Sequence, residues 1–132
     1  MPLFLGFLFA GCSPRPAARQ ISGDTLAAGE ELYNQNCALC HLDGKGSDLN
    51  PPLIGSEVVA GENSAALVRI MLRGQKGPIT VAGKAYDGIM PAQDFLTDEE
   101  VAAVAAYVRK TFGQKVEAVT ADEVARARAE TR

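Results

Sequence analysis

About a third of the way along, the chain carries the pentapeptide Cys37-Ala38-Leu39-Cys40-His41, a C-x-x-C-H pattern. His41 is the only histidine among the 132 residues, so its place directly after the second cysteine is informative. Two thiols one helical turn apart can form thioethers to both vinyl groups along one porphyrin edge, and the next imidazole can then ligate the iron. The pattern is typical of covalent c-type haem attachment. The sequence therefore predicts one haem c, bonded to Cys37 and Cys40 and ligated by His41.

Three other uses of these residues fit the sequence less well. A structural zinc site takes four protein ligands, whereas the chain offers Cys37, Cys40 and His41, and its third cysteine, Cys12, lies in an apparent export segment. A thioredoxin-like redox pair is expected beside a βαβ pattern, and no alternation of strands and helices flanks the motif. A disulfide between cysteines three apart inside a helix would be strained. We favour haem attachment over all three.

Size and charge limit the remaining possibilities. A chain of 132 residues fits one domain, and the small interior of such a domain would gain a large apolar surface from a buried porphyrin. The net charge is −3, from 13 basic and 16 acidic residues. No basic run is long enough to indicate a nucleic-acid partner, so none is expected.

Residues 1–12 have the features of a bacterial export signal. The apolar run at 3–10 has the length of a signal-peptide core and is too short to span a bilayer. The Ala-Gly pair before Cys12 resembles the lipobox of bacterial lipoproteins, in which this cysteine is acylated. Phe9 replaces the usual leucine, and no basic residue precedes the run, which suggests that the recorded start has lost a few residues.

We expect the protein to be exported to the periplasmic side of a bacterial membrane and anchored there by lipidated Cys12. Residues 13–23 show no periodic pattern of hydrophobic residues and are expected to act as a tether. Export fits the haem, because bacterial c-type maturation is completed outside the cytoplasm. The alternative is a soluble periplasmic protein with an ordinary signal peptide, in which Cys12 has no role.

The rest of the chain predicts an all-α fold. Asp24 and Asn63 are the expected N-caps of the first two helices, and Thr97 to Glu100 forms a capping box for the clearest one. A second box at Thr120 to Glu123 predicts a short tail helix. A small hairpin is expected from 79–81 and 84–86, with its turn at Ala82-Gly83. The expected organisation is a signal over 1–12, a tether over 13–23, a domain over 24–114 and a helical tail over 115–132.

Over residues 24–114 the chain resembles a class I cytochrome c. Gly29 and Tyr33, eight and four residues before the first haem cysteine, fall where the family has a glycine and an aromatic. Val104 and Tyr107 fall where its last helix has an aliphatic and an aromatic residue. The resemblance implies that these two helices cross. It also implies the cytochrome c fold, with three main helices and loops around one covalent haem.

The resemblance extends to two loops. Pro51-Pro52-Leu53-Ile54-Gly55 is similar to the family's P-x-L-x-G loop. This similarity implies that the carbonyl of Pro51 accepts a hydrogen bond from the second ring nitrogen of His41, which fixes the tautomer of that ligand.

The second loop supplies the expected sixth ligand, Met90. It precedes Pro91, which restricts it to an extended backbone, and a similar Met-Pro step carries the axial sulfur in many members of the family. A His/Met pair raises the reduction potential of a haem. The other internal methionine, Met71, lies on the apolar stripe of the middle helix and is expected to pack in the core or the haem wall.

The expected function is that of an electron carrier, not an enzyme, with no small-molecule substrate. The segment 83–91 and the tail from Phe112 resemble cytochrome subunits or domains that accompany periplasmic dehydrogenases or terminal oxidases, which implies such redox partners. One alternative is a haem-based sensor or ligand-binding protein with a displaceable sixth ligand. A peroxidase would need a distal acid–base group, and no second histidine exists. A cytochrome subunit fixed in one complex remains a further alternative.

Overall fold

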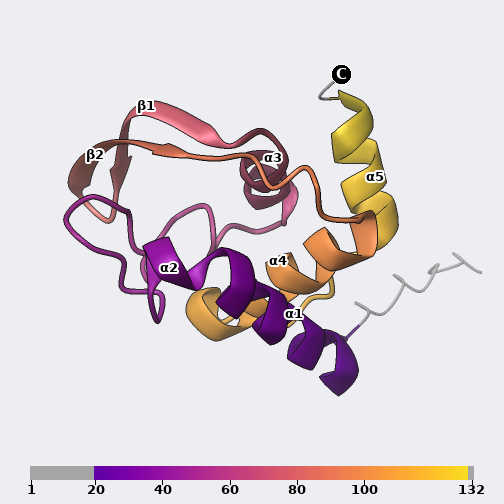
Figure 1. The fold of residues 1–132 in the computed structure, drawn as a ribbon. Helices are drawn as coiled ribbons and strands as arrows, with labels where there is room; N and C mark the ends of the chain where they lie inside the picture. The colour runs from indigo at the N-terminus through magenta and orange to yellow at the C-terminus, as the bar shows by residue number, and fades with distance from the viewer. Residues whose placement is uncertain (1–19, 131–132) are drawn as a thin grey trace, which may run out of the picture.

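A computed structural model describes residues 20–130 of the chain (Figure 1). The expected signal, Cys12 and most of the expected tether lie outside the described residues. Within the described range, helices predominate, as the predicted all-α class requires, and one two-stranded antiparallel sheet is added. No helix in this range is long and apolar enough to cross a membrane. The elements are α1 (Gly23–Asn36), α2 (Ala38–His41), α3 (Ala65–Arg73), β1 (Gln75–Val81), β2 (Lys84–Met90), α4 (Asp98–Gly113) and α5 (Ala121–Glu130).

The first helix begins one residue before the predicted N-cap. Ser22 caps α1, because its hydroxyl accepts a hydrogen bond from the backbone N–H of Thr25 at 3.2 Å. The prediction of Asp24 as the cap is wrong. Asp24 lies instead in the first turn, where a carboxylate still interacts favourably with the positive end of the helix dipole. Ser22 competes successfully because a hydroxyl caps as well as a carboxylate.

Helices α1 and α4 cross at Gly29 (Figure 1). A Cβ atom at this position would contact the backbone oxygen of Ala103 and lie 2.8 Å from the Cβ of Tyr107. The missing side chain therefore allows the two backbones to approach. Beside the crossing, the ring of Tyr33 lies 5.5 Å from that of Tyr107 and 5.4 Å from that of Phe112. This aromatic cluster fixes α1, and hence the C-x-x-C-H segment that follows it.

The hairpin is longer than predicted. Strands β1 and β2 pair continuously from Gln75 opposite Met90 to Val81 opposite Lys84. The predicted turn position is confirmed, since Ala82 and Gly83 have φ values of 48° and 79°, the backbone of a type I′ hairpin turn. The longer pairing places Met90 at the end of a strand and not in a loop.

The C-terminal part of the described chain packs onto the domain. Thr97 and Glu100 form the predicted capping box of α4, and Thr120 and Glu123 exchange the same pair of bonds before α5. Arg128 then joins α5 to the start of α4, donating to Asp98 at 2.8 Å and to two backbone carbonyls nearby.

The first described residues contact the segment that joins α4 to α5. Gln20 forms an isolated antiparallel bridge with Glu117, and Ile21 packs against the core. Residues 20 and 21, which belong to the segment expected to be a tether, are therefore in contact with the rest of the described chain.

Candidate functional site

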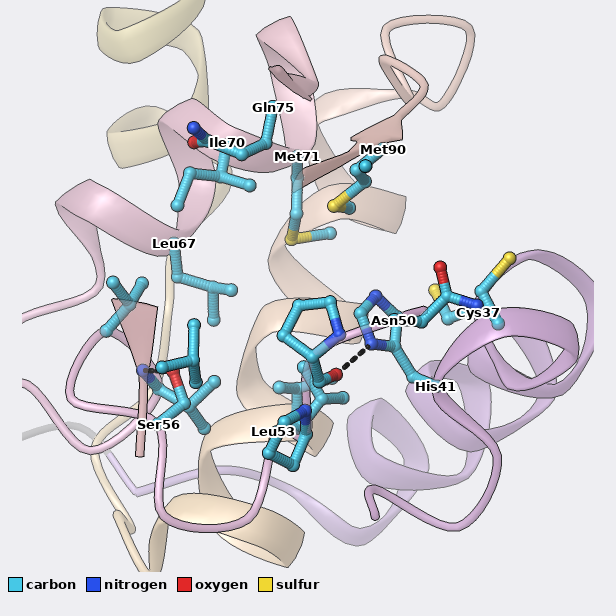
Figure 2. A pocket seen from close by; sticks show the side chains of 18 of the residues that line it. Cys37, His41, Asn50, Leu53, Ser56, Leu67, Ile70, Met71, Gln75 and Met90 are labelled. Atoms are coloured by element: carbon cyan, nitrogen blue, oxygen red, sulfur yellow. Dashed lines mark hydrogen bonds between the residues drawn. The ribbon is translucent and has the colours of Figure 1, made fainter. Parts of the chain in front are cut away.

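A cavity of about 460 Å³ lies between the C-x-x-C-H segment, the loop that follows it, α3, the hairpin and α4 (Figure 2). Its volume falls within the range of roughly 300–1,000 Å³ that is typical of cofactor sites. Its wall is mainly apolar, with Leu53, Leu67, Val104 and Val108 among the lining residues. The cavity can therefore hold a large apolar group and exclude water from it.

His41 lies in the wall of this cavity and is 8% exposed. Its Nδ1 is 3.0 Å from the carbonyl oxygen of Pro51. Because a carbonyl can only accept, Nδ1 carries the proton, and Nε2 keeps a lone pair. In Figure 2 the dashed line marks this bond, and the other ring nitrogen points toward the methionines. The ring is therefore oriented to donate Nε2 to a metal in the cavity.

The turn that follows His41 holds Pro51 in place. The backbone N–H groups of Gly44 and Gly46 both donate to the carbonyl of His41, at 2.9 and 3.1 Å. The N–H of Leu53 donates in turn to the carbonyl of Gly44 at 2.8 Å. Gly46 has a φ of 64°, and a Cβ there would lie 2.7 Å from the carbonyl carbon of Pro51. A glycine is thus required for the loop to close on the histidine.

Two methionines line the cavity across from His41. Met90, at the end of β2, is half-buried, and Met71, in the last turns of α3, is 3% exposed. In Figure 2 both sulfur atoms lie on the side toward which the free nitrogen of His41 points. The prediction that Met71 packs in the core is confirmed, but the sequence did not indicate that it would line the same cavity as Met90.

Cys37 and Cys40 line the same cavity as free thiols. Cys40 is exposed and Cys37 half-buried, so this edge of the cavity lies at the surface. Burial, followed by the charge of Cys40, raises the pKa of the Cys37 thiol to about 11. Among the described residues, no group of three or more His, Cys, Asp and Glu could hold a metal ion.

The wall next to the cysteines contains Tyr33. Burial, with a smaller contribution from Cys37, raises the pKa of this phenol well above its usual range. The hydroxyl donates to the carbonyl of Leu42 at 2.8 Å. Tyr33 therefore remains neutral and ties α1 to the residue that follows His41.

Four basic side chains of the segment from α3 to the hairpin do not line the cavity: Arg69, Arg73, Lys76 and Lys84. Lys84 pairs with Asp48 at 2.8 Å, and hydrogen bonding to Lys84 lowers the pKa of Asp48. Both groups are exposed, so the pair contributes little to stability. Arg73 donates to the carbonyl of Glu130 at 3.1 Å. Two of these cations thus hold loops and the tail, outside the cavity.

Sequence reasoning also missed the role of Arg109. A basic residue near the carboxyl end of a helix usually interacts with the helix dipole at the surface, but Arg109 is 1% exposed. Its Nη1 donates to the backbone carbonyls of Val59, Gly61 and Asn63, at 3.4, 3.1 and 2.9 Å. Its Nε has no partner in the described structure. The sequence does contain one indication that Arg109 is buried. It lies four residues after Ala105, and therefore on the same face of α4 as that buried residue.

The sequence of this chain is similar to those of known proteins. The model of a cytochrome c family, described as cytochrome c oxidase, cbb3-type, subunit III, matches residues 24–108. The chain is 38% identical over 113 residues to cytochrome c-552 of Thermus thermophilus, which covers 78% of this chain and 86% of that protein. It is 35% identical over 95 residues to the chloroplastic cytochrome c6 of Chlamydomonas reinhardtii, covering 70% and 59% of the two chains.

A third relative is longer than this chain. The cytochrome c subunit of the quinone-dependent alcohol dehydrogenase of Gluconobacter oxydans is 34% identical over 88 residues, which covers 65% of this chain but only 18% of that subunit. The match to this subunit is therefore confined to one segment of it.

The helical fold around one apolar cavity, with two cysteines and a histidine on its edge, defines a protein that holds a single covalent porphyrin. The chain belongs to the cytochrome c family. It is a monohaem c-type cytochrome that carries haem c and transfers electrons, and it is not itself an enzyme. The described residues fit this group, because the cavity is large and apolar, its edge carries both thiols, and His41 presents a free nitrogen to it.

Proposed function

We propose that this cytochrome holds its haem iron between Nε2 of His41 and the sulfur of Met90. The observation that carries the proposal is the bond from His41 Nδ1 to the Pro51 carbonyl, which leaves Nε2 directed across the cavity toward the methionine side (Figure 2). The bound haem supplies a one-electron Fe(II)/Fe(III) couple whose potential His/Met ligation raises. The apolar wall acts in the same direction, because low polarity disfavours the additional charge of the ferric state.

The visible spectrum of the ferric protein tests this ligation. We expect the weak near-red band of sulfur-to-iron charge transfer, and we expect the reduced protein at neutral pH not to bind carbon monoxide. Proton NMR of the reduced protein should show one methionine methyl resonance shifted strongly upfield by the porphyrin. A missing band together with rapid carbon monoxide binding would contradict His/Met ligation and favour the sensor alternative.

The relatives support redox proteins as partners, because some are named as cytochrome subunits of dehydrogenases. We infer that this cytochrome exchanges electrons with a dehydrogenase or a terminal oxidase. The exposed edge at Cys40 is where a partner's cofactor can come close. Transient electron-transfer interfaces bury less than roughly 1,200 Å², so a freely diffusing carrier should not co-purify with its partner. Stable co-purification would support the alternative of a fixed subunit.

We also propose that the protein is exported to the periplasmic side and held at a membrane surface by acylated Cys12. The tether before α1 would raise its effective concentration near membrane partners. The substitution Cys12→Ala should move the haem protein from the membrane fraction to the soluble periplasmic fraction, because this residue would carry all the acyl chains of the anchor. A stable anchor needs more than one such chain. Immunoblots of the two fractions measure this, and an unchanged distribution would contradict lipidation at Cys12.

A further inference from the structure

We infer that Met71 is a second thioether ligand, which takes the sixth position of the iron when Met90 is absent or displaced. This inference rests on the proposed His/Met ligation and adds a residue to it. Its basis is that two methionine sulfurs, from different elements, lie on the same side of the cavity, opposite the free nitrogen of His41 (Figure 2).

The fold explains why Met71 and Met90 line the same cavity. Strand β1 follows α3 directly after Gly74, and the hairpin register brings Met90 back opposite Gln75. Gly74 has a φ of 74°, and a Cβ added there would contact the backbone oxygen of Met90. The absence of a side chain at Gly74 therefore lets the backbone at Met90 approach the end of α3. The N–H of Gln93 donates to the carbonyl of Met71 at 2.7 Å. The chain before and after Met90 is thus fastened to the helical turn that carries Met71.

The chemistry of the surrounding side chains also favours Met71. Two amide side chains, those of Gln75 and Gln93, line the cavity nearby. Their nitrogens donate to the backbone carbonyls of Lys76 and Pro91, at 3.3 and 3.1 Å. An amide nitrogen has no lone pair available for a metal, and an amide oxygen is a hard ligand, so among the described residues of this wall the soft donor besides Met90 is the Met71 sulfur. A methionine side chain has three rotatable bonds and adapts to irregular space, so its sulfur can shift toward the iron without moving α3.

A consequence follows for the iron. Replacement of one thioether by another preserves the ligand type, so the protein keeps a six-coordinate site and an electron-transfer potential of similar magnitude. An outside ligand such as carbon monoxide remains excluded. A spare ligand of this kind would protect the carrier against the loss of Met90, for example by oxidation of its sulfur.

Three variants of the haem-loaded protein test the inference: Met90→Ala, Met71→Leu and the double variant. Met90→Ala should retain a near-red band and an upfield methionine methyl resonance, shifted in position from that of the unmodified protein. Met71→Leu, which keeps Met90, should retain a near-red band and an upfield methyl resonance, and it measures how far the loss of the Met71 side chain itself shifts them. The double variant should lose both signals and bind carbon monoxide when reduced. The change to leucine nearly conserves volume, so Met71→Leu also serves as the control for packing.

The possible outcomes are distinct. If the unmodified protein shows the band and Met90→Ala loses it and binds carbon monoxide as the double variant does, the role of Met71 is disproved while the proposed ligation stands. If the unmodified protein lacks the band, the proposed ligation itself fails. Haem mass and far-ultraviolet circular dichroism of each variant exclude failed maturation or misfolding as the cause of a lost signal.

Discussion

Gly29→Ala should destabilise the folded protein by about 1–2 kcal/mol, and Gly29→Val by more. Overpacking a close contact costs roughly 1–3 kcal/mol, whereas alanine gains about 1 kcal/mol over glycine within a helix. The cost dominates here, because the added Cβ would meet the backbone oxygen of Ala103 and the Cβ of Tyr107, 2.8 Å away. Neither can move without separating α1 from α4.

Gly23→Ala is the matched control, since Gly23 lies in the same helix and an added Cβ there would have no atom within 4 Å. This variant should be neutral or slightly stabilising. Denaturant unfolding of the haem-loaded proteins measures both changes. Equal free energies of unfolding for the two alanine variants would show that the crossing of α1 and α4 tolerates a side chain.

Arg109→Met should lower the free energy of unfolding by about 3 kcal/mol. The substitution relieves the cost of burying a charge, but it leaves the carbonyls of Val59, Gly61 and Asn63 without their donor. A buried acceptor left without a partner costs roughly 1–3 kcal/mol. The bond to Val59 is buried and those to Gly61 and Asn63 are part-buried, so the summed loss should still exceed the gain. The loop at 59–63 should also loosen, and hydrogen exchange there should accelerate more than elsewhere.

The neighbouring Lys110 provides the control, because it is exposed on the same turn. Lys110→Met removes the same charge and should change stability by no more than about 0.5 kcal/mol. Thermal unfolding and hydrogen exchange of the two variants separate the loss of loop hydrogen bonds from the loss of charge. Similar stability of both variants would mean that Arg109 does not hold the loop.

Local signals in the sequence predicted most elements correctly. The capping boxes at Thr97 and Thr120 are present as predicted, because their hydrogen bonds join residues three apart and depend on no distant part of the chain. The hairpin turn at Ala82-Gly83 was located for the same reason. The errors arose where two local solutions compete, as with Ser22 and Asp24, or where pairing continues beyond the turn, as in β1 and β2.

The candidate site was predicted in part. His41, Pro51 and Met90 were chosen from the sequence, and the structure places all three at one cavity; their ligand roles remain predictions. The burial of Arg109 was not predicted, because its position near a helix end is a local property, whereas its burial depends on the loop at 59–63 folding over it.

The sequence alone determined the covalent cofactor, since the spacing of Cys37, Cys40 and His41 is a property of one short segment. It also determined the helices and the turn, whose stabilising contacts are local. Only the tertiary structure decided that Met71 and Met90 share one side of the cavity. That proximity follows from the strand register and from the fastening of the chain around Met90 to the end of α3, and neither is encoded in the spacing of the two methionines.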